Sequence, residues 1–118
     1  MATGWKQVGG KWYYFNGDGI MQTGWQYVDG KWYYLHSDGS MATCWLSNSW
    51  KWYYLNNDGS MVTGWKQVEN KWYYMNESGQ MQANKWISGI YYVKGNGEMA
   101  TSEWVDGYYV DNNGVWVR

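Results

Sequence analysis

The stretch "GKWYYFNGDGIMQTGW", residues 10–25, decides the fold because it returns along the chain with few changes. It recurs as "GKWYYLHSDGSMATCW" at 30–45 and as "WKWYYLNNDGSMVTGW" at 50–65, and a fourth copy, "NKWYYMNESGQMQANKW" at 70–86, has one extra residue. A short fixed period is typical of repeat architectures, in which one supersecondary unit is used many times. The repeat is therefore the feature from which fold and function are predicted.

Each copy has the pattern of a β-hairpin. Pairs such as Gly9-Gly10 and Asp29-Gly30 separate a short strand-like run from Lys-Trp-Tyr-Tyr, and they suit the positive φ of a tight hairpin turn. A second turn rich in glycine follows and leads to a methionine. Because a single hairpin is marginally stable in water, consecutive hairpins must stack. We predict an all-β solenoid of stacked hairpins, one module over residues 1–118 with about six repeats, the last two degenerate and capping.

The composition excludes several classes of protein. The chain has 12 Trp and 13 Tyr, and its net charge of −1 comes from 9 basic and 10 acidic residues that are scattered along it. No basic surface of the kind that binds nucleic acid is visible, no apolar run is long enough to span a bilayer, and the start "MATGWKQ" lacks the pattern of a signal peptide. Cys44 is the single cysteine, which rules out an internal disulfide and fits an exported protein. We expect no nucleic-acid partner and no membrane insertion.

The polar residues give little support for catalysis or metal binding. There is no Ser, His and Asp set and no zinc-like spacing of His and Cys, and the carboxylates recur in turns. His36 is interpreted as a solvated turn residue, and the Asp-Gly pairs at 18–19, 38–39 and 58–59 fit ordinary turn chemistry better than a calcium site. We therefore expect no catalytic residue, no metal site and no cofactor in this chain.

The aromatic residues divide between the two faces of each hairpin. Successive side chains of a strand point to opposite faces, so Trp12 and Tyr14 share one face while Tyr13 and Phe15 share the other. The face of Tyr13 and Phe15 is predicted to pack, together with its equivalents Leu35, Leu55 and Met75. The other face holds only Trp and Tyr. Such rings can form a cage for a quaternary ammonium, stack on a sugar, or simply pack neighbouring hairpins, and the motif favours the cage.

The repeated unit Gly-Trp, Lys-Trp-Tyr-Tyr, Asp-Gly, Met and Thr-Gly-Trp resembles the choline-binding repeat of cell-wall-attached proteins from pneumococci, related bacteria and their phages. The resemblance covers nearly the whole chain. It implies a left-handed solenoid in which choline lies between neighbouring repeats, held by two Trp of one repeat and a Tyr of the next, with a Met closing the pocket. The implied cages are Trp5, Trp12, Tyr34 and Met41; Trp25, Trp32, Tyr54 and Met61; Trp45, Trp52, Tyr74 and Met81; and Trp65, Trp72, Tyr92 and Met99.

The resemblance also implies a setting for the chain. It implies an extracellular, non-catalytic module of the bacterial cell wall that anchors to choline on teichoic or lipoteichoic acids, in a parent protein that may be a cell-wall hydrolase. Some relatives dimerise through terminal repeats, which implies a possible homodimer. Two alternatives stay open: a glucan- or other carbohydrate-binding module like the related repeats of streptococcal glucosyltransferases and clostridial toxins, and a structural spacer. The paired Trp residues seven positions apart, kept four times, favour choline.

The repeat is broken at Ile90, Cys44 and Trp50. Ile90 stands where the second Trp of the fifth repeat belongs, so a cage that used Trp86 and Tyr109 would lack one wall. Cys44 and Trp50 replace glycines of the other repeats, and the sequence gives no functional reason for either.

Overall fold

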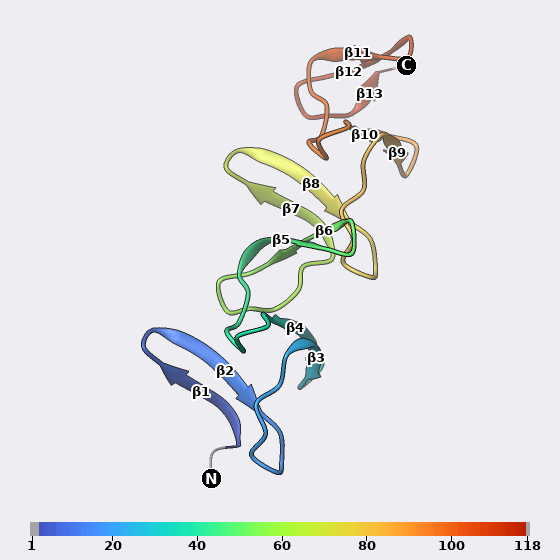
Figure 1. Ribbon diagram of the computed structural model, residues 1–118. Helices are drawn as coiled ribbons and strands as arrows, with labels where there is room; N and C mark the ends of the chain where they lie inside the picture. The colour runs from blue at the N-terminus through green and yellow to red at the C-terminus, as the bar shows by residue number, and fades with distance from the viewer. Residues whose placement is uncertain (1–2, 118) are drawn as a thin grey trace. The chain divides into compact units, whose positions relative to one another are not determined.

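The computed structural model describes residues 3–117, and within this range the chain forms strands and no helix (Figure 1). The all-β prediction is therefore confirmed. The strands are β1 (Gly4–Val8), β2 (Lys11–Phe15), β3 (Gly24–Val28), β4 (Lys31–Leu35), β5 (Cys44–Asn48), β6 (Lys51–Leu55), β7 (Gly64–Val68), β8 (Lys71–Met75), β9 (Lys85–Ile87), β10 (Tyr91–Val93), β11 (Glu103–Val105), β12 (Tyr108–Val110) and β13 (Trp116–Val117).

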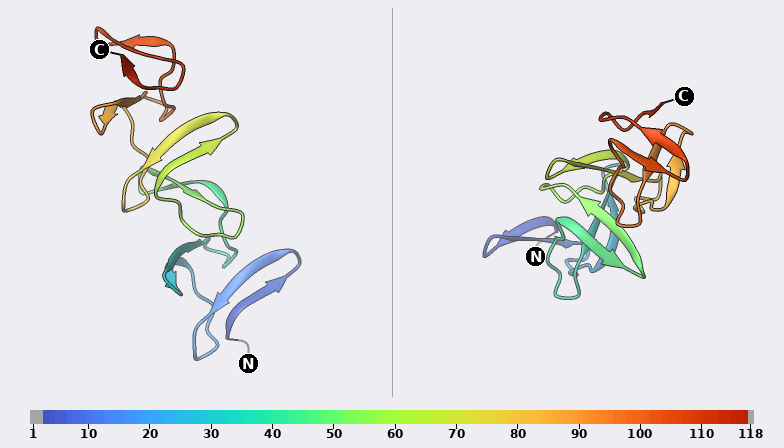
Figure 2. Two further views of the ribbon diagram at one scale, coloured as in Figure 1. Left: turned by 180° about the vertical axis from the view of Figure 1, so that it is seen from behind. Right: turned by 90° about the horizontal axis from the view of Figure 1, so that it is seen from above.

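Consecutive strands pair as antiparallel hairpins: β1 with β2, β3 with β4, β5 with β6, β7 with β8, and β9 with β10. The last sheet has three strands, in the order β11-β12-β13. The two strands of each hairpin lie side by side in every view (Figures 1 and 2). Register is the same from repeat to repeat, since Trp5 faces Tyr14 in the first hairpin and Trp25 faces Tyr34 in the second.

The hairpins form two compact units, which divide between Val62 and Thr63. The first unit contains β1 to β6 and the second contains β7 to β13. The hairpin strands have five residues through β8 and three or fewer from β9 onward, so the repeat shortens within the second unit. The grouping of all 118 residues into a single module stays a prediction.

The tight hairpin turns explain where the repeat needs glycine. Both central residues of the first turn are left-handed, with φ of 60° at Gly9 and 83° at Gly10, as a type I′ turn requires. In the third hairpin, Ser49 and Trp50 adopt the same conformation, with φ of 52° and 67°. The Trp50 side chain is 98% exposed, so no packing offsets the strain of its backbone. Trp50 is thus a local weakness of the hairpin, and nothing in the structure explains why it is there.

Replacing Trp50 with glycine should stabilise the protein by about 0.5–1 kcal/mol. A left-handed conformation costs a non-glycine residue about 1–2 kcal/mol, and the greater freedom of glycine in the unfolded chain takes back part of that gain. Urea unfolding of Trp50→Gly against the parent protein measures the change. Trp50→Asn should give a smaller gain because Asn tolerates this conformation better than Trp. A Gly variant that is no more stable than the parent would contradict the interpretation.

Within each unit, a methionine that follows one hairpin bonds to the hairpin before it. Met41 forms an isolated antiparallel bridge with Leu35 at the end of its own hairpin, and its N–H donates to the carbonyl of Trp12 in the preceding hairpin at 2.8 Å. Met61 donates in the same way to Trp32 at 2.8 Å. Met99 and Trp72 repeat the bond in the second unit at 2.7 Å. These backbone bonds place each methionine beside the tryptophan whose carbonyl it contacts.

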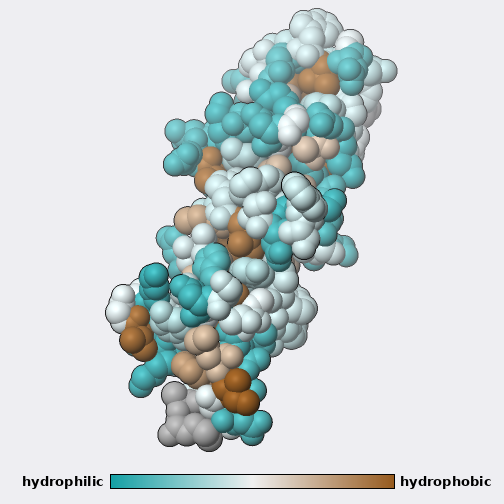
Figure 3. Space-filling view, viewed as in Figure 1, coloured by the Kyte–Doolittle hydropathy of each residue, from teal (hydrophilic) through white to brown (hydrophobic). Residues whose placement is uncertain are grey.

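The apolar core is thin and repeats with the hairpins. The residue that follows Trp-Tyr-Tyr is fully buried in three successive hairpins, as Leu35, Leu55 and Met75, and the prediction of a packed face is confirmed at these positions. Phe15, at the same place in the first hairpin, is half-buried. On the face shown in Figure 3, the most apolar residues form separate spots, with no continuous patch. Much of the packing between hairpins must therefore come from the aromatic rings.

Candidate functional site

The first unit contains a pocket of about 320 Å³ that is lined mainly by residues of the repeat motif. Trp5 comes from β1, Trp12 from β2 and Tyr33 from β4, and Met41 follows the second hairpin. The turn after β6 completes the lining with Asn57 and Asp58. Three successive hairpins therefore contribute to one pocket.

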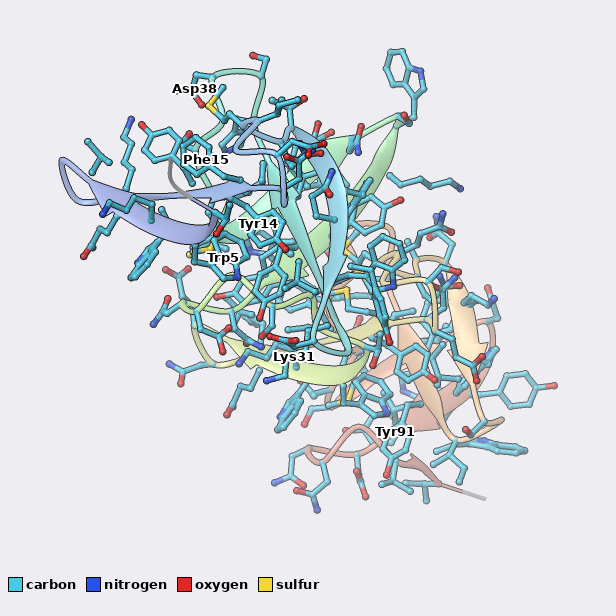
Figure 4. The ribbon with its side chains drawn as sticks, turned by 90° about the horizontal axis from the view of Figure 1, so that it is seen from below. Trp5, Tyr14, Phe15, Lys31, Asp38 and Tyr91 are labelled. Carbon is cyan, nitrogen blue, oxygen red and sulfur yellow. The ribbon has the colours of Figure 1, made fainter. Side chains whose placement is uncertain are left out.

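Strand pairing and backbone bonds fix the rings of this pocket. Trp5 pairs with Tyr14 across the first hairpin, and their ring centroids lie 5.0 Å apart (Figure 4). The ring of Tyr33 approaches Trp5 from the next hairpin, with centroids 4.9 Å apart and planes inclined by 64°. Trp12, opposite Gln7, keeps 40% of its surface exposed. The pocket therefore has aromatic walls and an open side.

The structure places a different tyrosine at this pocket from the one that was predicted. Tyr34 lies against Trp25 of its own hairpin, with centroids 5.1 Å apart, and Tyr33 takes the place beside Trp5. The reason is strand alternation. Tyr34 shares a face with the Trp pair of its own hairpin, whereas Tyr33 is on the opposite face, which meets the preceding hairpin.

The same arrangement recurs elsewhere in both units. Tyr53 lies 4.9 Å from Trp25, and Tyr91 lies 5.3 Å from Trp65, between ring centroids. The predicted tyrosines contact a Trp of their own hairpin instead: Tyr54 lies 5.1 Å from Trp45, Tyr74 lies 5.1 Å from Trp65, and Tyr92 lies 5.2 Å from Trp86. The tyrosine that contacts the preceding hairpin is therefore the first tyrosine of Lys-Trp-Tyr-Tyr. In the fifth hairpin, where the Trp is missing, it is the first tyrosine of Tyr91-Tyr92.

The predicted tryptophan pairs are close together where ring contacts describe them. Trp25 and Trp32 have centroids 6.5 Å apart at 82°, and Trp45 and Trp52 have centroids 6.3 Å apart at 88°. The third predicted cage combines Trp45 and Trp52 of the first unit with Tyr74 and Met81 of the second. That cage stays a prediction. The fourth predicted cage lies within the second unit. There the Met99 N–H bonds to the Trp72 carbonyl, which brings Met99 beside the hairpin that carries Trp65 and Trp72.

A turn glycine lies close to three of the predicted pocket methionines, Met41, Met81 and Met99. A Cβ at Gly59 would overlap the sulfur of Met41, which lines the first pocket. Gly97 has the same relation to Met81, and Gly114 to Met99. Gly59 also has a φ of +88°, so both backbone conformation and space require glycine there. The turn after one hairpin therefore helps to shape a pocket that begins two hairpins earlier.

Asp58 adds a negative charge to the first pocket. Its Oδ1 accepts hydrogen bonds from the Ser60 hydroxyl at 2.6 Å and the Ser60 N–H at 2.9 Å, and these bonds lower the pKa of the Asp58 carboxyl. Burial and the nearby carboxylate of Asp58 raise the pKa of the Tyr33 phenol. The pocket therefore combines neutral aromatic rings with an ionised carboxylate at neutral pH. Sequence reasoning assigned Asp58 to turn chemistry alone and missed its position beside the rings.

Asp58→Asn should weaken the binding of a cationic ligand in the first pocket by roughly two- to fivefold, as expected for the loss of a solvent-exposed charge pair. The lowered pKa keeps the carboxyl ionised well into the acid range, so affinity should be constant between about pH 5 and pH 8. It should fall only when the pH drops below the ordinary aspartate value of 3.8. A titration followed through the Trp12 indole signal, repeated at several pH values, measures both effects.

Asp38→Asn is the matched control for this change. Asp38 makes the same two bonds to Ser40, at 2.6 and 2.9 Å, but does not line the first pocket. Equal losses of affinity in the two variants would show that the turn, and not the charge at the pocket, is responsible.

Metal clusters and membrane-spanning helices were also sought in the part of the chain that the structure describes. No group of three or more His, Cys, Asp or Glu is placed to hold a metal ion among residues 3–117. Over the same range, the structure has no helix of the length and apolarity that crossing a membrane takes. Cys44 is exposed with a free thiol.

Comparison with known proteins links these pockets to a family. Models of the choline-binding repeat match residues 2–50, 22–63, 48–86 and 80–116. The comparison with curated proteins gives no match.

Three solved structures from Streptococcus pneumoniae are similar to the chain. Choline-binding protein F has 48% identity and a TM-score of 0.93 over 100% of this chain and 41% of its own. The modular autolysin LytC has 34% identity and a TM-score of 0.75, over 97% and 27%. CbpJ has 40% identity and a TM-score of 0.59, over 98% and 48%. The chain thus spans less than half the length of each of these proteins, and its repeated hairpins are the solenoid fold of this group. On the repeats and on these structural matches together, the chain belongs to the choline-binding repeat family.

Proposed function

We propose that this chain is a non-catalytic, extracellular module that anchors a protein to the bacterial cell wall by binding choline on teichoic or lipoteichoic acids. The observation that carries the proposal is the pocket of Trp5, Trp12, Tyr33 and Met41, with the Asp58 carboxylate at its lining. Aromatic faces attract a quaternary ammonium, and an ionised carboxylate adds to that attraction. A sugar would instead need several polar groups around it, and the motif residues of the pocket provide few.

The expected affinity of one pocket is low. Each ring contributes about 0.5–2 kcal/mol to cation binding, and the loss of translational and rotational freedom opposes it. A single pocket then falls near a millimolar dissociation constant, about −4 kcal/mol. Several pockets on one chain, facing a polymer that repeats its choline, gain avidity from the high effective concentration of the second ligand. Repetition therefore suits a wall anchor.

The similar structures support this proposal in chemical terms. One structure of choline-binding protein F was solved with ipratropium, whose head group is a quaternary ammonium, and another in the presence of a peptidoglycan analogue. LytC is described as a modular autolysin and is longer than this chain, which fits a parent protein with a separate catalytic part. A homodimer through the terminal repeats stays a prediction.

A titration of intrinsic Trp fluorescence with choline chloride tests the proposal. Ammonium chloride at the same ionic strength controls for salt, and soluble dextran tests the carbohydrate alternative. Saturation in the millimolar range with choline alone supports the wall-anchor function. A response to dextran alone would replace it with glucan binding, and no response to any of the three would leave a spacer as the better description.

Tyr33, which lines the first pocket, gives a sharper test at that pocket. Tyr33→Leu should weaken choline binding by about 2- to 30-fold in the first pocket, because it removes one ring and keeps an apolar side chain in its place. Indole N–H signals of Trp5 and Trp12 in NMR spectra measure affinity there. Tyr13→Leu is the control, since Tyr13 has the same place in its hairpin but does not line this pocket. Unchanged affinity in Tyr33→Leu would remove Tyr33 from the site.

A further inference from the structure

A second aromatic pocket lies in the last two hairpins, where the repeat departs most from its pattern. It has a volume of about 170 Å³ and is lined by Trp86, Gly89, Tyr108 and Trp116. All four residues belong to the second unit. The sequence predicted no complete cage here. A cage of Trp86 and Tyr109 would lack one aromatic wall, because Ile90 stands in place of the second Trp. The structure places Tyr109 against Trp104 instead, with centroids 5.2 Å apart.

Three rings of this pocket meet at steep angles. The centroids of Trp86 and Tyr108 are 6.1 Å apart with planes at 88°, and those of Tyr108 and Trp116 are 5.4 Å apart at 87°. Trp86 and Trp116 are 6.3 Å apart at 56°. The Trp–Trp separation is the same as that of Trp45 and Trp52, a predicted choline pair. Rings inclined in this way form walls around a common space, as those of the first pocket do.

Trp116 supplies the wall that Ile90 lacks, and it does so from the methionine position. The Met99 N–H, which follows the fifth hairpin, donates to the carbonyl of Trp72 in the fourth hairpin, and Trp72 is the second Trp of the pair Trp65/Trp72. One repeat later, the Trp116 N–H donates to the carbonyl of Ile90 at 2.9 Å. Trp116 therefore occupies the place of Met, and Ile90 occupies the place of Trp. The two substitutions compensate: the repeat loses an aromatic ring at Ile90 and gains one at Trp116.

The shortened fifth hairpin leaves room for a small ligand. Its turn, at Ser88 and Gly89, has left-handed φ values of 57° and 69°, and the Ile90 N–H closes it onto the Ile87 carbonyl at 3.1 Å. Gly89 lines the pocket, and a Cβ there would meet no atom within 4 Å, so this side of the pocket is open. The lining side chains offer only two indole N–H groups and one phenol as polar partners. This chemistry suits a compact cation better than a sugar.

We propose that Trp86, Tyr108 and Trp116 form an additional cage for a small quaternary ammonium, in which Trp116 replaces the ring that the repeat loses at Ile90. The choice of a quaternary ammonium as the ligand of this cage rests on the proposed function. It extends choline recognition to a repeat that lacks the paired-Trp motif, so the motif undercounts the sites of this chain.

Indole N–H signals of the full chain in ¹⁵N–¹H NMR spectra test this cage, with choline chloride as ligand and sodium chloride at equal ionic strength. The neutral isostere 3,3-dimethylbutan-1-ol is the second probe. In the parent protein, the Trp86 signal should shift with choline and saturate, and the isostere should have a much smaller effect. Trp116→Met, which installs the ordinary residue of the repeat, should weaken this response by about 2- to 30-fold.

Two further variants make the result specific. Ile90→Trp combined with Trp116→Met rebuilds the ordinary arrangement and should restore the Trp86 response. Trp104→Leu is the control, because Trp104 is 70% exposed and does not line the pocket, and it should leave the response unchanged. Equal affinity in Trp116→Met and the parent, or equal shifts with choline and the isostere, would overturn the proposal.

The signals of Trp5 and Trp12 separate this proposal from the function on which it rests. If they respond to choline while Trp86 does not, the additional cage fails and the wall-anchor function stands. If no Trp signal responds to choline, the function fails and the cage with it.

Discussion

Gly59→Ala will lower both the free energy of unfolding and the affinity of the first pocket for choline. Its φ of +88° costs a side chain about 1–2 kcal/mol, and the new Cβ would overlap the sulfur of Met41. Relief of that overlap must move Met41, which lines the pocket, and overpacking of this kind costs about 1–3 kcal/mol more. Urea unfolding and a choline titration read at Trp12 should therefore both show a loss, with a stability change of about 2–5 kcal/mol.

Gly10→Ala separates the two causes of this loss. Gly10 has a similar φ of +83°, but a Cβ there would meet no atom within 4 Å. This variant should lower the free energy of unfolding through backbone strain alone, and it should leave the choline affinity of the first pocket unchanged. If Gly10→Ala and Gly59→Ala change binding equally, then Met41 is not positioned by the turn and the coupling described above is wrong.

Leu55→Ala should destabilise the protein by about 2–5 kcal/mol, the usual range for a cavity left by a buried leucine. Leu55 is fully buried and packs with Ala42 and Leu46 in the core of the first unit. Partly buried rings pack against the same cluster, Trp25 and Tyr53 among them, and these two form an inter-hairpin contact of 4.9 Å. The substitution should also loosen that ring contact, so the choline response of the Trp25 signal should weaken.

Val8→Ala is the matched control for the core substitution. Val8 ends β1 and is 57% exposed, so its loss should change the free energy of unfolding by no more than about 0.5 kcal/mol. Thermal or urea unfolding of the two variants measures the difference. A small effect of Leu55→Ala would mean that the aromatic rings, and not the aliphatic positions, hold the hairpins together.

Local patterns in the sequence predict the hairpins well because their causes are local. Gly9-Gly10 and Asp29-Gly30 supply the left-handed conformation that a tight turn needs, and the structure has both pairs at hairpin turns. Burial of Leu35 follows from period-two alternation within one strand. These predictions require no knowledge of how one hairpin meets the next.

The pockets were predicted less well because they depend on contacts between hairpins. Alternation put Tyr33 on the face that was predicted to pack and Tyr34 on the opposite face, but it did not show which rings of the preceding hairpin each tyrosine meets. Asp58 was missed because it reaches the first pocket from two repeats further along the chain. Trp116 was missed because its place in the repeat normally holds methionine. Aligning Gly114-Val115-Trp116 with Gly97-Glu98-Met99 would have shown that Trp116 stands at the methionine position.

The first pocket extends from residue 5 to residue 58, far beyond the 20-residue spacing of the tryptophans. The unit that can be duplicated or lost during evolution is therefore shorter than the unit that binds. Recombination of one whole repeat would preserve the hairpin turns, yet it would change the neighbours of a pocket that several hairpins share. In such an array, the affinity of a pocket for its ligand could be changed by shuffling the order of existing repeats, without any new residue having to arise by point mutation.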